Sequence, residues 1–188
     1  MSIEEAGWSR ATTEHLELRA VSADDLDVLY QLLSDPRVWT HFPAGVYTSQ
    51  LQTAQAVARH RAAWHRDRLG YWTAWLHDGS FAGTGGCSVQ SDAAWNLYYR
   101  FRPEQQGHGY ATELARTARE AAASVRPDLP VAASVLAHNA ASRAVAVAAG
   151  LRKVWEGPDP AGRTAGQTRL LFADRDLTQA QVQVMLRT

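Results

Sequence analysis

Residues 102 to 112 read Arg102-Pro103-Glu104-Gln105-Gln106-Gly107-His108-Gly109-Tyr110-Ala111-Thr112 and join two strongly patterned segments. Before this loop, residues 95–101 are rich in aromatic side chains, which is typical of a strand. After it, residues 112–125 are rich in Ala, Leu, Arg and Glu, which is typical of a helix. Glycine lacks a Cβ, so the two glycines let the main chain turn tightly and approach a ligand. Because the first amides of a helix are free to bind an anion, the loop predicts a phosphate site.

Three kinds of phosphate-binding loop can be compared with this stretch. A P-loop ends in Gly-Lys-Ser/Thr, whereas the equivalent place here holds Gly109-Tyr110-Ala111. A dinucleotide-binding fingerprint needs Gly or Ala where Thr112 stands, and it lies in an early βαβ unit rather than past mid-chain. The third kind agrees: Gln106-x-x-Gly109-x-Ala111 after a strand resembles the acetyl-CoA loop of the GNAT superfamily of N-acyltransferases.

The resemblance to GNAT proteins continues beyond the loop. Downstream, Asn139-Ala140-Ala141-Ser142-Arg143 resembles the Asn-x-x-Ser pattern that follows the fifth strand of these proteins. Other segments resemble the branch of ribosomal-protein N-terminal acetyltransferases (RimJ/RimL type). These segments are Leu18-Arg19, Asp35-Pro36-Arg37-Val38, Tyr99, and Gly107 to Glu113. Together the similar segments span about residues 15–175.

Hydrophobic periodicity and turn residues predict a single α+β domain. We expect strands at residues 16–21, 71–76, 81–89, 95–101, 131–136, 151–156 and 167–172, and helices at 22–35, 49–68, 112–125, 140–149 and 178–186. Residues 1–14 are expected to form an N-terminal tail, and 15–188 a single N-acetyltransferase domain. The resemblance implies the GNAT acyl-CoA N-acyltransferase fold, a mixed central sheet of about seven strands flanked by helices.

Composition limits the classes of function. The 188 residues are 46% hydrophobic and 20% charged, as in ordinary globular proteins. Lys+Arg and Asp+Glu both number 19, so no basic excess indicates a nucleic-acid partner. The only cysteine, Cys87, is expected to pack as a small residue. No apolar run approaches the ~20 residues that cross a bilayer, and no signal peptide is apparent, so we expect a cytoplasmic protein.

The resemblance implies acetyl-CoA as co-substrate and no metal. It further implies that the strands at 95–101 and 131–136 splay apart and hold pantetheine between them. Main-chain groups around Tyr99 to Phe101 would hold the thioester, and an amide there would stabilise the oxyanion. The cofactor contacts implied in this way are Phe101, Gln106, Gly107, His108, Gly109, Tyr110, Ala111, Thr112, Asn139, Ser142 and Arg143.

The catalytic acid and base are only partly recognisable. Many GNAT enzymes place a tyrosine acid seven residues after the Asn, where this chain has Ala146. The resemblance then makes Ser142 and Tyr99 the catalytic candidates, with Ser142 hydrogen-bonding the departing sulfur. A glutamate that serves the branch as base on the fourth strand is replaced by Asn96, which leaves His41 as a candidate base.

The acceptor stays open between a protein N-terminal α-amine and a small-molecule amine such as a polyamine or an antibiotic. A polyamine pocket should be lined with carboxylates. Aromatic residues are candidates for the wall of the acceptor pocket, namely Trp39, Phe42, Trp72 and Trp95.

Two alternatives to acetyl transfer and one question of assembly also stay open. Because Asn96 and Ala146 depart from the family pattern, one alternative is a non-catalytic CoA-binding regulatory module. The other is a different donor such as succinyl-CoA, which Arg100 and Arg102 could favour. A homodimer is likewise left open.

Overall fold

A computed structural model describes residues 7–159 and 166–187 of the chain. The described strands form one mixed eight-stranded sheet in the order β1-β2-β3-β4-β5-β6-β8-β7. The strands are β1 Arg10–Thr12, β2 Leu16–Ala20, β3 Tyr71–Leu76, β4 Phe81–Gln90, β5 Ala94–Phe101, β6 Val131–Leu136, β7 Arg152–Pro158 and β8 Thr168–Ala173. The α-helices are α1 Leu26–Leu33, α2 Gln50–Asp67, α3 Tyr110–Val125, α4 Ala140–Ala148 and α5 Gln179–Met185. This is the predicted α+β class with the predicted order of elements.

The segment before β2 differs from its prediction. Of the expected tail, residues 1–6 lie outside the described residues, but residues 10–12 form β1 and pair antiparallel with β2, Arg10 opposite Arg19. The carbonyl of Trp8 also accepts a hydrogen bond from Trp72 Nε1 at 2.8 Å. The sheet therefore has eight strands rather than about seven, because three residues are too few for an alternating pattern to be recognised.

Polar residues that predicted helix starts cap the chain before α1 and at α2: α2 begins directly after its cap, whereas α1 begins at Leu26 after a 3-10 turn over Ala23–Asp25. Ser22 and Asp25 form a reciprocal capping box ahead of α1, and Ser49 and Gln52 form another at the start of α2. Each box satisfies main-chain amides that no helical carbonyl can reach. Capping thus fixes where α2 starts, and it fixes the 3-10 turn that leads into α1.

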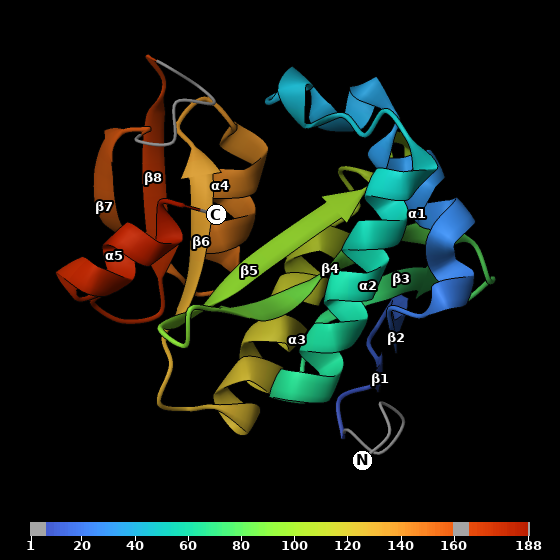
Figure 1. Ribbon diagram of the computed structural model, residues 1–188, viewed down its shortest axis with the longest axis horizontal. Helices are drawn as coiled ribbons and strands as arrows, with labels where there is room; N and C mark the ends of the chain where they lie inside the picture. Colours follow the sequence, from blue (N-terminus) through green and yellow to red (C-terminus); the bar gives the residue numbers. More distant parts are fainter. Residues whose placement is uncertain (1–6, 160–165, 188) are drawn as a thin grey trace.

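Helices cover both faces of the sheet (Figure 1). Helices α3 and α4 pack on the face that carries Leu97, Phe101 and Val135. On the opposite face, α1 and α2 pack over Tyr71 and Phe81, and α5 covers the part of the sheet near β6 and β8. The core consequently divides into a larger cluster under α3 and α4 and two smaller clusters on the opposite face.

The middle strands separate soon after they meet. β5 and β6 run parallel and pair only at Trp95 with Val131 and at Asn96 with Ala132. β5 continues alongside β4 as far as Phe101, so its edge toward β6 loses its partner beyond Asn96. Figure 1 shows the two strands diverging, with α4 beside β6. This is the splay that the resemblance implied.

Candidate active site

The gap between β5 and β6 opens into a cleft of about 1130 Å³. The structure brings most of the predicted site residues to its lining: Tyr99, Phe101, Gln106, Gly107, Gly109, Tyr110, Ala111, Thr112, Asn139 and Ser142. Two predicted residues do not line it. The His108 ring stacks on Tyr110 with 5.5 Å between ring centroids, and Arg143 is exposed on the outer side of α4.

The glycine loop presents a run of free main-chain amides at the start of α3. Gly107 and Gly109 have φ of 84° and 86°, and a Cβ built on either would meet nothing within 4 Å. The amides of Thr112 and Glu113 donate to the carbonyl of Gly109 at 3.0 and 3.1 Å. Those of residues 107–111 have no main-chain acceptor among the described residues. Five amides near the positive end of a helix are therefore without a main-chain partner in the described chain, which suits a pyrophosphate.

The side chain of Gln106 connects this loop to the end of β5. Its Nε2 donates to the carbonyl of Phe101 at 3.1 Å, and its own amide donates weakly to Pro103 at 3.3 Å. The loop is thus tied to the end of β5. Charge-assisted hydrogen bonds to an anion contribute about 1.5–3 kcal/mol each, so several amides together could bind pyrophosphate firmly.

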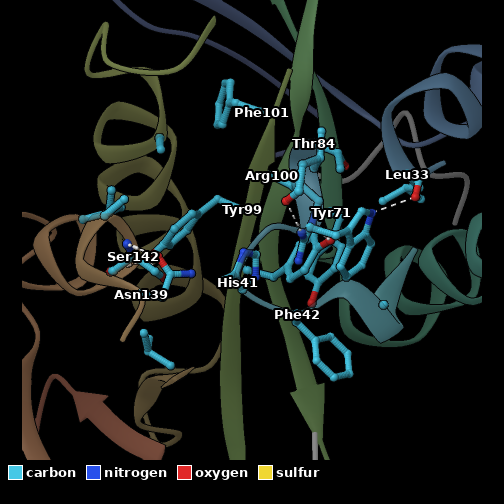
Figure 2. A pocket seen from close by; sticks show the side chains of 18 of the residues that line it. Leu33, His41, Phe42, Tyr71, Thr84, Tyr99, Arg100, Phe101, Asn139 and Ser142 are labelled. Atoms are coloured by element: carbon cyan, nitrogen blue, oxygen red, sulfur yellow. Dashed lines mark hydrogen bonds between the residues drawn. The ribbon is translucent and has the colours of Figure 1, made fainter. Parts of the chain in front are cut away.

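Tyr99 and Ser142 meet across the splayed strands, as Figure 2 shows. Tyr99 Oη donates to the Ser142 carbonyl at 2.8 Å and lies 3.0 Å from Ser142 Oγ. Asn139 caps α4, since its Oδ1 accepts from the amide of Ser142 at 3.0 Å. Burial raises the pKa of Tyr99 to about 12, against the opposing effect of the Ser142 hydrogen bond. The Tyr99 hydroxyl therefore stays protonated at neutral pH.

This pair of hydroxyls can supply one proton donor to the cleft. The single proton of Tyr99 is directed to the carbonyl of Ser142, which leaves the Ser142 hydroxyl free to donate either to Tyr99 or into the cleft. Ala146, at the family's tyrosine position, is fully buried in the core and does not line the cleft. The hydroxyls of Tyr99 and Ser142 are thus the pair that lies between β5 and α4, where the family's tyrosine is absent.

A family model described as the acetyltransferase (GNAT) domain matches residues 15–152. The chain belongs to the GNAT acetyltransferase family. The family assignment made from the glycine loop and the Asn139-x-x-Ser142 pattern is thereby confirmed. No curated protein sequence matches the chain.

Solved GNAT structures share the fold at low sequence identity. RimL, a ribosomal L7/L12 α-N-protein acetyltransferase in complex with coenzyme A, is 20% identical with a TM-score of 0.74, covering 89% of this chain and 97% of that one. An acetyltransferase from Salmonella typhimurium that modifies the N-terminal serine of L7/L12 is 20% identical with a TM-score of 0.72, covering 88% and 97%. An Agrobacterium tumefaciens acetyltransferase is 23% identical with a TM-score of 0.70, covering 89% and 94%.

On the other face of β5 this GNAT acetyltransferase carries Arg100, which the sequence suggested only as a residue that could favour succinyl-CoA. The Arg100 guanidinium lies 3.5 Å from the centroid of the Trp39 ring. Its Nη1 donates to the carbonyl of Val38 at 3.0 Å and its Nε to Tyr98 Oη at 2.7 Å. It lies opposite Thr84 in the pairing of β5 with β4, and Figure 2 shows it away from Ser142. Alternation along β5 was the available signal, because consecutive side chains point to opposite faces.

Two histidines are held uncharged in or beside the cleft. Burial, helped by Arg100 and His138, lowers the pKa of His41 to about 4. Burial and then Arg59 lower the pKa of His60 to about 4, and its ring packs 4.5 Å from that of Tyr71. Both imidazoles are therefore neutral at pH 7, and their low pKa makes each a weak base. The Asn96 amide approaches Tyr71 Oη at 3.4 Å and offers no base.

The predicted aromatic wall is half present. Trp39 and Phe42 line the cleft, as Figure 2 shows for Phe42. Trp72 and Trp95 are instead fully buried in the core, where their large apolar area stabilises the fold. Cys87 is buried as expected, and burial raises the pKa of its thiol. No helix in the described ranges has the length and apolar character required to cross a membrane.

Proposed function

We propose that the chain transfers the acetyl group of acetyl-CoA to a primary amine by direct attack of the neutral amine on the thioester. The observation that carries this proposal is the row of five free amides at 107–111, which leads directly into the splay between β5 and β6. A coenzyme with a pyrophosphate and a pantetheine arm fits that combination. Acetyl-CoA, when bound, supplies the activated acyl group.

Each part of the cleft has a role in this proposal. The loop binds pyrophosphate, and the unpaired edge of β5 beyond Asn96 binds the pantetheine arm with main-chain groups. An amide near Phe101 stabilises the charge that develops on the thioester oxygen. The Ser142 hydroxyl, positioned by Tyr99, donates a hydrogen bond to the departing sulfur. Holding the two reactants together provides much of the acceleration.

The base is the least specialised part of the site. An amine that reaches the cleft uncharged needs only an acceptor for the proton it loses after attack. His41 lines the cleft and is neutral because its pKa is about 4, which makes it the candidate acceptor. A weak base of this kind suffices only when the amine arrives deprotonated, so turnover should rise with pH toward the pKa of the amine.

Thiol release from acetyl-CoA across a panel of amines tests the transfer reaction. We expect acetyl-CoA to bind and at least one amine to accelerate release. The panel should begin with peptide α-amines, because the similar RimL structures are named α-N-protein acetyltransferases. Succinyl-CoA should serve as a second donor. Tight binding of acetyl-CoA with no acceleration by any amine would instead support a CoA-binding regulatory module.

A further inference from the structure

The half of the cleft that faces α1 and α2 is lined largely by aromatic side chains. We call this half the acceptor chamber, and its aromatic walls are Trp39, Phe42, Tyr47, Tyr71 and Tyr98. The rings of Tyr71 and Tyr98 stack 5.1 Å apart and 6° from parallel, and those of Trp39 and Tyr47 lie 6.0 Å apart. Such walls suit a ligand with an apolar or flat body.

Positive charge dominates the lining of the cleft. Four arginines contribute to it, whereas its described lining residues include no aspartate or glutamate. The four are Arg37, Arg59, Arg100 and Arg169. Those at 37 and 169 form ion pairs with carboxylates that do not line the cleft. For the other two, no carboxylate lies within ion-pair distance in residues 7–159 and 166–187.

Arg100 is the better placed of these two uncompensated arginines. Arg59 is exposed on α2, while Arg100 is half-buried and held by Trp39, Val38 and Tyr98. Within the described chain, its Nη2 donates to no acceptor. A fixed guanidinium with an unused donor and no counter-charge matches a carboxylate on the ligand, since the planar fork binds carboxylates with two hydrogen bonds.

We propose that the acceptor is a primary amine that carries a carboxylate within a few bonds of its nitrogen, and that Arg100 binds this carboxylate. The inference rests on the proposed function, because it names the acceptor class of the same cleft. A free amino acid with an apolar side chain presents this chemistry, and so does a peptide whose first residue is acidic. A polyamine does not, because its extra ammonium groups would be buried beside arginines without a counter-charge.

Two matched pairs of acceptors test the inference on the intact enzyme. The first pair is L-phenylalanine and L-phenylalaninamide, and the second is a short peptide amide beginning with glutamate or with glutamine. Spermidine is the polycation control. With rates corrected for the fraction of neutral amine, we expect the carboxylate member of at least one pair to have a kcat/KM at least tenfold higher. The pair that discriminates identifies the source of the carboxylate.

Variants then assign the discrimination to Arg100. Arg100→Gln should reduce the preference at least fivefold without weakening coenzyme binding, and Arg100→Lys should keep part of it. Arg66→Gln, which removes an exposed charge paired with Asp67 on α2, should change nothing. If Arg100→Gln does not fold, the preference of the wild type and of Arg100→Lys for the carboxylate acceptor still tests the proposal.

Several outcomes would overturn the acceptor class. They are equal rates within both pairs, a preference for spermidine, a loss of coenzyme affinity in Arg100→Gln, or an effect of that variant only on the choice between succinyl-CoA and acetyl-CoA. Transfer to carboxylate-free amines at undiminished rate would overturn this inference and leave acetyl transfer intact. If no amine accelerates thiol release from acetyl-CoA, both the acceptor class and acetyl transfer to an amine are overturned.

Discussion

At the scale of single residues, Gly109 carries the main-chain conformation on which coenzyme binding depends. Its φ of 86° lies in a region that costs other residues about 1–2 kcal/mol, and a Cβ here would project into open space on the loop. We expect Gly109→Val to weaken CoA binding at least tenfold, or about 1.4 kcal/mol, because the side chain occupies the place of phosphate oxygens. Isothermal titration with CoA measures this.

The control for this variant is Gly79→Val. Gly79 lies in the turn between β3 and β4, has the same φ of 86°, and also has nothing within 4 Å of a built Cβ. Both variants should lose similar stability, but only Gly109→Val should lose CoA affinity. A folded Gly109→Val protein with unchanged affinity would refute the pyrophosphate assignment.

The second prediction for single residues concerns Ser142 and Tyr99. Ser142→Ala should lower kcat while CoA affinity stays nearly constant, because the hydroxyl acts on the departing sulfur. Tyr99→Phe should lower kcat less, since Tyr99 positions the serine and its own proton goes to the Ser142 carbonyl. Steady-state thiol release gives both values. An unaltered kcat in Ser142→Ala would remove the serine from the mechanism.

Individual residues show where sequence reasoning succeeds and stops. Gln106, Gly109 and Asn139 could be selected because they match the loop and the Asn-x-x-Ser patterns of GNAT proteins. Arg100 was named from the sequence only as a residue that could favour succinyl-CoA, because its stacking on Trp39 and the lack of acidic side chains in the described lining of the cleft do not show in the sequence. Both facts depend on segments far apart in the chain.

At the scale of elements, α3 stabilises the end of α4. Arg119 Nη1 donates to the carbonyls of Ala149 and Gly150 at 3.0 and 3.3 Å, and Arg116 Nε donates to Ala148 at 3.0 Å. Cations at a helix C-terminus satisfy free carbonyls and complement the helix dipole. Helix α4 carries Ser142 and its cap Asn139 at the opposite end, so the same contacts hold one wall of the cleft.

We therefore expect Arg119→Met to lower the free energy of unfolding by about 1 kcal/mol, the scale of such capping contacts. The methionine keeps much of the apolar stem and removes the donors. Urea denaturation measures the change. Arg66→Met is the matched control, because Arg66 is paired only with its neighbour Asp67 on the surface. Equal effects of the two variants would contradict the capping role.

Most elements were predictable because their ends carry local signals. Ser22, Ser49 and Thr178 form capping boxes in the structure, and α4 ends just before Gly150. β1 was missed because its stability comes from pairing with β2 rather than from its own pattern. The distance at which β5 and β6 separate was likewise invisible without the family resemblance.

At the scale of the whole molecule, two neutral histidines couple stability to pH. The pKa values of His41 and His60 are about 4 in the folded protein and near the usual 6.5 when unfolded. The unfolded chain therefore binds more protons between these values. Their contribution to stability is fully present above pH 6.5 and is lost as the pH falls toward 4.

Thermal unfolding between pH 7 and 4 tests this coupling. We expect the melting temperature to fall across that interval and to fall less steeply in His60→Gln, which cannot take up a proton. His65→Gln, at an exposed position on the same helix, should keep the wild-type slope. Parallel slopes for the wild type and His60→Gln would show that His60 does not contribute.

The two-residue contact between β5 and β6 has a mechanical consequence. It divides the sheet into two leaves joined by a narrow hinge, one leaf ending in β5 and the other beginning with β6. A pantetheine arm inserted between them would join the two parts of the sheet, because it would add hydrogen bonds to main-chain groups beyond the two paired residues. Amide hydrogen exchange in β6 and β8 should then slow when CoA binds, although both strands lie beyond the loop that holds its phosphates.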